Sequence, residues 1–234
     1  MNIELHNVTK TYGTLLALDN VSLEIESGAK VALIGPNGSG KSTLIRALMG
    51  MVQCEGTIRV DGCDPGRDRS CIARQAAYVP QAMPQFSFTI AEMIAAIALI
   101  RGLAPEAIEF CAHRLGLDVR AVWNKPVKQL SGGMKQKLML ALALAPKTRL
   151  LILDEPTASL DSDTRARFYE LITERAGYTT LILSSHRLDE VRRLVTHFVM
   201  LDGGRIHQRG LVEDFIGSEA AKMLESKERD HVAA

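Results

Sequence analysis

The stretch Val31-Ala32-Leu33-Ile34-Gly35-Pro36-Asn37-Gly38-Ser39-Gly40-Lys41-Ser42 decides the fold. Its first four residues form a continuous apolar run, which is typical of a strand buried on both faces of a sheet. The next eight match the phosphate-binding pattern GxxxxGK[ST], in which glycines let backbone N–H groups turn towards phosphate oxygens and the following helix adds partial positive charge. Lys41 is expected to reach the β- and γ-phosphates, and the Ser42 hydroxyl to ligate Mg²⁺.

A second apolar strand, at residues 150–155, ends in two carboxylates, Asp154 and Glu155. In an open α/β sheet, ligands bind beyond the carboxyl ends of the strands, so we expect both acids to face the phosphate loop. Adjacent acids cannot point the same way from a strand end, which indicates two different roles. Asp154 is predicted to support the Mg²⁺ shell, and Glu155 to polarise the attacking water as a general base.

Length and composition limit the classes of protein that remain open. With 234 residues, the chain can form one large domain or a core that carries an inserted subdomain. Lys and Arg number 28 against 27 Asp and Glu, so no overall positive charge favours nucleic acid. The four cysteines lack metal-ligand spacing and are expected to be free thiols. No charged leader precedes an apolar run at the start, and the longest apolar run, 90–100, is shorter than the ~20 residues that cross a bilayer. We therefore expect a cytosolic protein.

Strand and helix periodicities predict an α/β fold around these motifs. The pattern is strand-rich up to residue 79, mostly helical from 89 to about 148, and alternating between strand and helix afterwards. Thr89 and Glu92 match a capping box at the start of the helical part. Strands are predicted at 3–8, 21–25, 31–34, 57–60, 76–79, 149–153 and 179–183, helices at 42–49, 134–144, 162–174 and 187–194, and a hairpin at 198–206.

The predicted architecture is an α/β nucleotide-binding core with a β-rich edge at the N-terminus and a helical insertion. We assign residues 1–88 and 149–217 to the core and residues 89–148 to the insertion. Residues 218–234 form a charged tail, which is expected to be an exposed helix that frays.

A second glycine-rich turn, Ser131-Gly132-Gly133, lies just ahead of the carboxylate strand. Taken alone, it reads as an ordinary helix start with Ser131 as the N-cap. Taken with its neighbours, it completes an ordered set that resembles the ATPase subunit of ABC transporters, from Tyr12 to about Gly210. The set comprises the phosphate loop, Gln81 after a strand, Leu130-Ser131-Gly132-Gly133, residues 150–155, Ser159-Leu160-Asp161, and His186 after a strand.

This resemblance implies a P-loop NTPase fold with a RecA-like core, an N-terminal antiparallel β-subdomain and an inserted helical subdomain. It further implies that two copies enclose two ATP molecules head to tail with Mg²⁺, and that Ser131 and Gly133 contact the γ-phosphate bound by the opposite copy. The expected catalytic residues are Lys41, Glu155 and His186, and the expected Mg²⁺ ligands are Ser42, Gln81 and Asp154. The residues expected at the nucleotide are Tyr12, Gly35, Pro36, Asn37, Gly38, Ser39, Gly40, Lys41, Ser42, Thr43, Gln81, Ser131, Gly132, Gly133 and Asp161.

Several positions carry finer expectations from the same resemblance. Tyr12 stands where the family stacks an aromatic ring on adenine, although a tyrosine that packs a turn competes with this reading. Asp161 is expected to cross the dimer interface. Met134 replaces a common glutamine and Ser159 a common glycine, and neither change removes a proposed catalytic group.

A transporter of this kind needs a separate permease, which would hold the chain at the inner face of the cell membrane. The Met- and Phe-containing segment 82–88 is either a docking surface for that permease or a packing element of the helical insertion. The residues around 89–103 and 130–136 resemble ATPases of ABC-2-type permeases, which export drugs, peptides or polysaccharides or assist copper-site assembly. An importer of small solutes or metals is the alternative. A soluble ABC ATPase acting on ribosomes or DNA is disfavoured by the single ATPase unit and the absence of sustained heptads.

Overall fold

The central sheet of the molecule carries the predicted α/β core. The computed structural model describes residues 1–84, 86–175 and 177–216. Within them, six strands lie in the order β5 (Ala76–Val79), β6 (Leu150–Asp154), β7 (Thr180–Ser184), β3 (Lys30–Ile34), β8 (His197–Asp202) and β9 (Arg205–Leu211). The first five strands are parallel, and β9 returns antiparallel to β8. The α/β class and the positions of these strands were therefore predicted correctly from the sequence.

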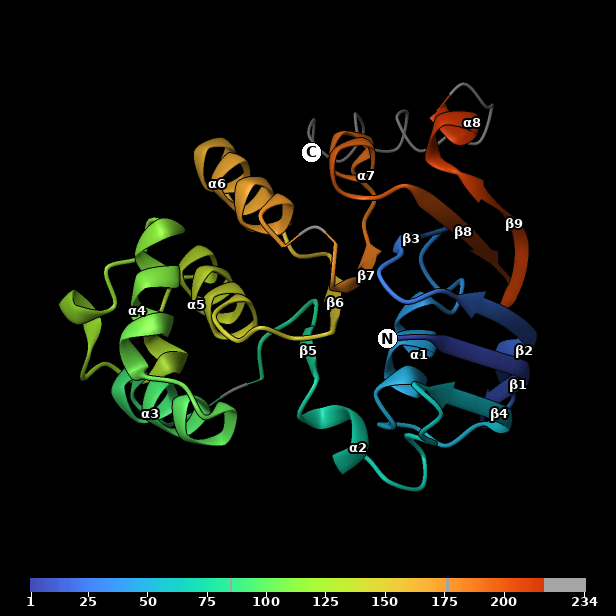
Figure 1. Cartoon of the computed structure of the whole chain (residues 1–234), viewed down its shortest axis with the longest axis horizontal. Helices are drawn as coiled ribbons and strands as arrows, with labels where there is room; N and C mark the ends of the chain where they lie inside the picture. Colours follow the sequence, from blue (N-terminus) through green and yellow to red (C-terminus); the bar gives the residue numbers. More distant parts are fainter. Residues whose placement is uncertain (85, 176, 217–234) are drawn as a thin grey trace.

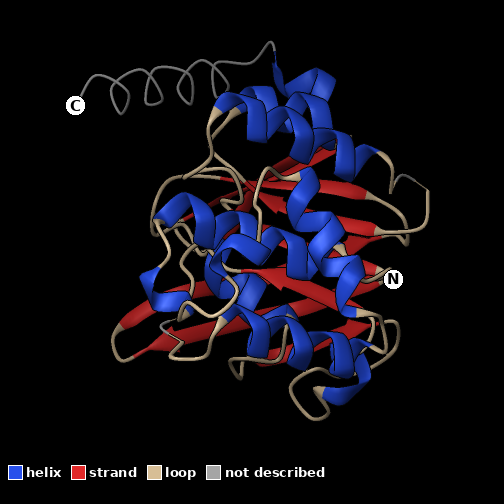
Figure 2. Cartoon of the chain, turned by 90° about the vertical axis from the view of Figure 1, so that its left-hand side faces the viewer, coloured by secondary structure: helices blue, strands red, loops and turns tan. Residues whose placement is uncertain are grey.

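Burial explains why the middle strands read as continuous apolar runs. All residues of β6 and β7 are buried, as are the last four of β3. Parallel strands are covered on both faces, so neither face needs alternating polar residues. Figure 2 shows several helices covering the face of the strands that is turned to the viewer.

A second, antiparallel sheet forms the N-terminal edge of the molecule. Its strands lie in the order β2 (Leu15–Ile25), β1 (Ile3–Tyr12) and β4 (Glu55–Val60), and they group together beside α1 (Lys41–Leu48) in Figure 1. Ile3 faces Ile25 on one side and Val60 on the other, and all three are buried. They share one hydrophobic cluster with α1 and with strands of the central sheet, so the two sheets pack around a common core.

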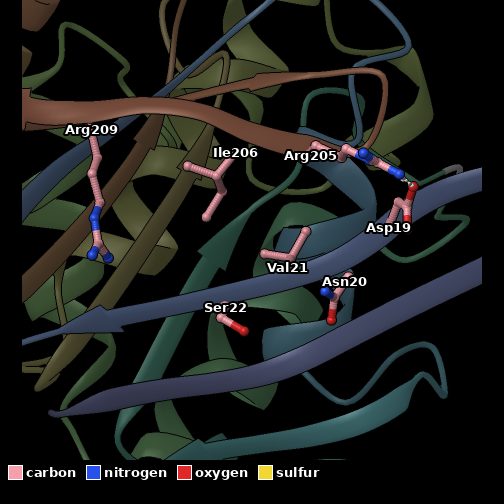
Figure 3. Close-up of a pocket in the computed structure, with 7 residues that line it drawn as sticks. All are labelled: Asp19, Asn20, Val21, Ser22, Arg205, Ile206 and Arg209. Carbon is pink, nitrogen blue, oxygen red and sulfur yellow. Dashed lines mark hydrogen bonds and ion pairs between the residues drawn. The ribbon is translucent and has the colours of Figure 1, made fainter.

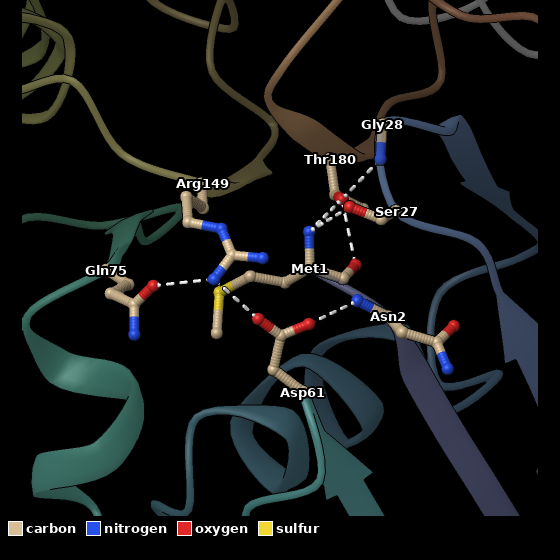
Figure 4. Close-up of polar contacts among 8 residues, drawn as sticks. All are labelled: Met1, Asn2, Ser27, Gly28, Asp61, Gln75, Arg149 and Thr180. Carbon is tan, nitrogen blue, oxygen red and sulfur yellow. Dashed lines mark hydrogen bonds and ion pairs between the residues drawn. The ribbon is translucent and has the colours of Figure 1, made fainter.

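Polar contacts also join the two sheets (Figure 4). The Met1 nitrogen donates to Thr180 Oγ1 at 2.7 Å, which links the start of β1 to β7. Asp61, just after β4, accepts from the Asn2 nitrogen at 2.8 Å and lies 2.8 Å from the Arg149 guanidinium, just before β6. These contacts hold the antiparallel sheet against the amino-terminal ends of the central strands.

The helical part of the chain lies to one side of the central sheet in Figure 1. It contains α3 (Ile90–Arg101), α4 (Pro105–Arg114) and α5 (Gly132–Leu144), with 3-10 turns at Arg120–Val122 and Val127–Gln129. The predicted capping box is confirmed: Thr89 Oγ1 accepts from the Glu92 nitrogen at 3.2 Å, and a Glu92 carboxylate oxygen accepts from the Thr89 nitrogen at 2.8 Å. None of the helices in the described part of the chain is long and apolar enough to cross a membrane.

The remaining helices follow strands of the core, and two of them were not predicted. The helices α6 (Ser162–Thr173) and α7 (Leu188–Leu194) match the expected positions. The short helices α2 (Ser70–Ala73) and α8 (Val212–Ile216) were missed, because four or five residues are too few to show a helical period. The predicted tail, 218–234, lies outside the described residues. All four cysteines are free thiols, as expected.

Candidate nucleotide-binding and catalytic site

The phosphate-binding loop connects β3 to α1 and depends on glycine at close approaches to other strands. Gly35 has φ +147°, and a Cβ there would lie 2.0 Å from the carbonyl oxygen of Leu201 on β8. Gly40 has φ +105°, and its Cβ would lie 2.5 Å from the carbonyl oxygen of Ala17 on β2. Both positions thus combine a backbone conformation that favours glycine with a lack of space for any side chain. The loop is held between the two sheets.

Lys41 is enclosed by the same loop. Its ammonium group donates to the carbonyl oxygens of Gly35 at 2.7 Å and Pro36 at 3.0 Å, and the residue is buried. Burial lowers the pKa of Lys41, while the nearby carboxylates of Glu155 and Asp154 act in the opposite direction. The positive charge therefore lies inside the loop and in electrostatic contact with both acids at the end of β6.

Ser42 and Asp154 bring together two oxygens from distant parts of the chain. The Ser42 hydroxyl donates to a carboxylate oxygen of Asp154 at 3.1 Å. Asp154 is the last residue of β6 and is buried, so its position is set by the sheet. Hydroxyl and carboxylate oxygens are hard ligands, and Mg²⁺ is commonly held by one or two such groups together with phosphate oxygens. This pair fits that pattern at the mouth of the phosphate loop.

Glu155 and His186 form a second polar pair at the same edge of the sheet. His186 Nε2 lies 2.8 Å from Glu155 Oε1. Glu155 has φ +52°, and its backbone nitrogen donates to the carbonyl oxygen of Ser184 at 2.9 Å. A positive φ is uncommon outside glycine, and here it ends the strand and gives Glu155 a direction of its own. Asp154 and Glu155 therefore have different neighbours, Ser42 for Asp154 and His186 for Glu155.

The turn Ser131-Gly132-Gly133 starts α5 rather than joining the phosphate loop of its own chain. Ser131 Oγ accepts from the Met134 nitrogen at 3.2 Å, which confirms the predicted N-cap. A Cβ on Gly132 would meet no atom within 4 Å, whereas one on Gly133 would lie 3.2 Å from the Ser159 carbonyl oxygen. Figure 1 shows α5 and α1 apart, with β5 and β6 between them. Within one chain the turn therefore starts a helix that lies apart from α1, the helix that follows the phosphate loop.

Three other residues are expected at the nucleotide, and within the described part of the chain the side chains of Tyr12, Gln81 and Asp161 form no hydrogen bond with the phosphate loop or with the acids at the end of β6. Tyr12 ends β1 and is 40% exposed, with the Lys10 ammonium 4.9 Å from its ring centroid. Gln81 follows β5 and is exposed. Asp161 caps α6, where it accepts from the Thr164 nitrogen at 2.8 Å and from the Thr164 hydroxyl at 3.0 Å. These hydrogen bonds lower the pKa of Asp161 to about 2.

One buried acid near the site was not identified from the sequence. Glu190 lies on α7, only 1% exposed, and accepts a 2.5 Å hydrogen bond from the Ser185 hydroxyl. Burial raises the pKa of Glu190 to about 7, and the nearby charge of Glu155 acts in the same direction. A signal was present: Glu190 falls at helical spacing with Val191 and Leu194, on the face of α7 that is buried.

An apolar groove of about 290 Å³ lies between β5, the segment after it, α3 and α5. Met83, Pro84 and Phe86 line this groove, and Met83 and Phe86 also pack against the core. Phe88 is 56% exposed, with its ring 6.0 Å from that of Phe86. The segment therefore packs the helical part and at the same time presents apolar groups to the outside.

A second hollow, of about 440 Å³, lies between β2 and β9 (Figure 3). Its charged groups include an ion pair between Arg205 and Asp19, whose atoms approach to 2.6 Å. The hollow contains none of the phosphate-loop residues or the acids of β6, so its size does not mark the catalytic site.

Comparison with known proteins agrees with this geometry. The family model described as ABC transporter matches residues 18–158. The Nod factor export ATP-binding protein I of Sinorhizobium fredii is 36% identical, over 97% of this chain and 69% of that protein. The tungstate uptake system ATP-binding protein TupC of Peptoclostridium acidaminophilum is 34% identical, over 88% of this chain and 97% of that protein.

Solved structures give the same result. A structure described as the ATP binding subunit of an ABC transporter superposes with a TM-score of 0.83 at 28% identity, over 96% of this chain and 100% of the other. A bacterial Atm1-family ABC exporter with ATP bound gives a TM-score of 0.85 at 26% identity, over 97% of this chain and 42% of the other. The chain therefore belongs to the ABC transporter family and is an ATP-binding, ATP-hydrolysing subunit of a transporter.

Proposed function

We propose that two copies of this chain bind and hydrolyse MgATP at their interface and thereby drive a separate membrane permease. One observation carries the proposal: Lys41, the Ser42–Asp154 pair and the Glu155–His186 pair meet at one edge of the central sheet. In this proposal residues 1–88 and 149–217 form the ATPase core, and residues 89–148 form a helical subdomain that couples it to the partner. The chain acts at the cytoplasmic, inner face of the cell membrane through the permease.

The residues of the sheet edge have complementary roles in hydrolysis. Residues 35–43 hold the triphosphate through backbone N–H groups, and the Lys41 ammonium neutralises the β- and γ-phosphates. Ser42, Asp154 and Gln81 are the proposed Mg²⁺ ligands, and the ion when bound would offset the charge that develops on the phosphate oxygens. Tyr12 stacks on adenine through the exposed part of its ring.

Glu155 is the proposed general base. A water oxygen attacks the γ-phosphorus as the bond to the β–γ bridging oxygen breaks, and the water proton passes to the Glu155 carboxylate. ADP leaves with the bridging oxygen, and phosphate carries the oxygen that came from water. The 2.8 Å contact between Glu155 and His186 supports a role for His186 in holding the water and the γ-phosphate.

A second copy supplies the remaining groups of the site. The N-terminus of α5 is open, and Gly132 leaves room for a ligand beside its Cα. Such a helix start attracts phosphate, because its first N–H groups lack partners within the helix and the helix dipole is positive there. Ser131 and Gly133 of one copy would contact the γ-phosphate held by the other copy, and Asp161 would help to position that interface. Loss of the γ-phosphate would then release the two copies from each other.

The groove beside α3 and α5 is the proposed docking site for the permease. It is lined mainly by apolar side chains. One of the segments that line it directly follows Gln81, which is a proposed Mg²⁺ ligand. A short amphipathic helix of the permease would bury its apolar face there, as in other helix-in-groove contacts. This placement connects the state of the nucleotide to the partner through a single segment of the chain.

Export through an ABC-2-type permease is the proposed direction of transport, and assistance in copper-site assembly belongs to the same branch. The support comes from residues 89–103 and 130–136, and from the similarity to proteins named for Nod factor export. Import of a small solute or metal is the second candidate, because the chain is also similar to a protein named for tungstate uptake. The net charge of +1 gives no support to a nucleic-acid partner.

Glu155→Gln tests the catalytic part of the proposal. The near-isosteric amide cannot take the water proton, so hydrolysis should fall by about 10²- to 10⁴-fold. ATP-dependent dimerisation, measured by size-exclusion chromatography with light scattering, should persist. Glu213→Gln makes the same charge change at an exposed position of α8 and serves as the control. Rapid hydrolysis by Glu155→Gln would show that another group acts as the base.

Introducing a charge into the groove tests the permease proposal. Met83→Glu places a carboxylate among apolar lining residues and should abolish co-purification with membranes. Met51→Glu is the matched control, because Met51 is 48% exposed and does not line the groove. Both variants should retain basal ATP hydrolysis. Recovery of the wild-type protein with ribosomes or DNA and without a membrane protein would refute the transport role.

A further inference from the structure

Glu190 lies beside the two segments that carry the proposed base and its histidine partner. The acid lies on α7, is buried, and accepts a 2.5 Å hydrogen bond from Ser185 Oγ. The side chain of Thr157 lies beside the same carboxyl group and lowers its pKa. Ser185 directly follows β7, and Thr157 lies in the turn after β6. One carboxyl group therefore lies close to the chain beyond both strands and forms a hydrogen bond with the segment after β7.

The hydrogen bonds continue from Ser185 around His186. Ser185 Oγ accepts from the Arg187 nitrogen at 3.1 Å, so the residues before and after His186 are tied to one hydroxyl. On the other side, Thr157 is two residues beyond Glu155, whose backbone nitrogen donates to the Ser184 carbonyl oxygen at 2.9 Å. Rotation of either turn would change the 2.8 Å separation between Glu155 Oε1 and His186 Nε2.

We propose that Glu190 is a positioning residue for ATP hydrolysis, which holds the turns after β6 and β7 so that Glu155 and His186 keep their mutual geometry. This inference rests on the roles proposed above for those two residues. Glu190 itself touches neither nucleotide nor water in the reaction. Its removal is expected to lower kcat and to leave nucleotide binding through Lys41 and Ser42 nearly unchanged.

The ionised form of Glu190 is the form that accepts the hydrogen bond from Ser185 most strongly. A carboxylate accepts hydrogen bonds at both oxygens, whereas a carboxylic acid gives up part of that capacity to its own proton. The titratable groups around it are Glu155 beyond β6, Asp189 on α7 and Tyr169 on α6. Burial raises the pKa of Glu190 to about 7. Protonation of Glu190 below neutral pH should therefore weaken its hydrogen bonding to the turn and lower kcat.

The first test compares Glu190→Gln with the wild-type protein and with the exposed control Glu213→Gln. The amide fits the cavity but keeps only one acceptor oxygen and cannot ionise. We expect kcat at about pH 8 to fall about tenfold or more, the KM for MgATP to stay within about twofold, and the inflection near pH 7 to disappear. Wild-type kcat with an unchanged pH profile, or a raised KM with unchanged kcat, would overturn the proposal.

A double-mutant cycle with Ser185→Ala supplies an independent readout. If Glu190 acts through the Ser185 hydroxyl, the double variant should lose little more kcat than either single variant. Additive losses of kcat would show that Glu190 does not act through the Ser185 hydroxyl. If Glu190→Gln folds poorly, the kcat of Ser185→Ala alone still tests the proposal. Glu155→Gln is assayed in parallel to separate this proposal from the base assignment. If Glu155→Gln still hydrolyses ATP, the assignment of Glu155 as the base fails. Loss of the pH inflection of kcat in Glu190→Gln would then still show a positioning effect of Glu190, exerted on another catalytic group.

Discussion

Replacing Gly35 by alanine separates two reasons for having glycine in the phosphate loop. Gly35 and Gly38 both have positive φ, +147° and +82°, but only at Gly35 would the new methyl group meet another strand, 2.0 Å from the Leu201 carbonyl oxygen. A Cβ at Gly38 would meet nothing within 4 Å. The backbone conformation alone costs an L-residue about 1–3 kcal/mol. Because β8 must move to admit the Gly35 methyl group, overpacking adds about 1–3 kcal/mol.

We therefore expect the free energy of unfolding to fall by about 2–6 kcal/mol in Gly35→Ala and by about 1–3 kcal/mol in Gly38→Ala. Urea unfolding followed by far-UV circular dichroism measures both variants against the wild-type protein. Calorimetric titration with MgATP then shows whether each folded variant still binds nucleotide. Equal unfolding free energies for the two variants, within about 0.5 kcal/mol, would refute the claim that contact with β8 constrains the loop.

Three further predictions concern single side chains. Thr89→Ala removes the capping box of α3 and should lower the unfolding free energy by about 1 kcal/mol, whereas Ser87→Ala at an exposed position should have little effect in the same urea assay. Tyr12→Ala should raise the Kd for ATP about 2- to 10-fold and Tyr12→Phe should not; equal calorimetric affinities would favour a turn-packing role. Asp161 has its pKa lowered to about 2 by Thr164, so its contribution to stability should be complete above an unfolded-state pKa of about 4 and lost as pH falls towards about 2. A carboxyl titration midpoint near 4 by NMR would contradict that account.

The parts of the site that depend on local pattern could be predicted from the sequence. The glycines at 35 and 40 and the capping residue Thr89 follow from rules that act within a few residues, and the structure shows the expected conformations. The strand ending in Asp154 was recognisable because a strand buried on both faces has no polar residues before its end. The resemblance to the ABC family then supplied the order in which these motifs belong together.

Features that depend on packing between distant segments could not be predicted in the same way. The hydrogen bond between Glu190 and Ser185 depends on how α7 packs against the turn after β7. The two readings of segment 82–88 were not separable either, because the same side chains pack the core and line the groove. Short-range sequence patterns contain no information about either contact.

The sequence by itself determined the class of fold, the phosphate loop and the presence of a second glycine-rich turn. Local backbone preferences and hydrophobic periodicity are properties of neighbouring residues, so they can be read along the chain. Only the tertiary structure decided that Ser42 meets Asp154, that Glu155 meets His186, and that α5 lies apart from α1. The first two relations come from the order of strands in the sheet. Ser42 and Asp154 are 112 positions apart and become neighbours only because β7 pairs with both β3 and β6, and the pairing of β6 with β7 likewise brings Glu155 to His186.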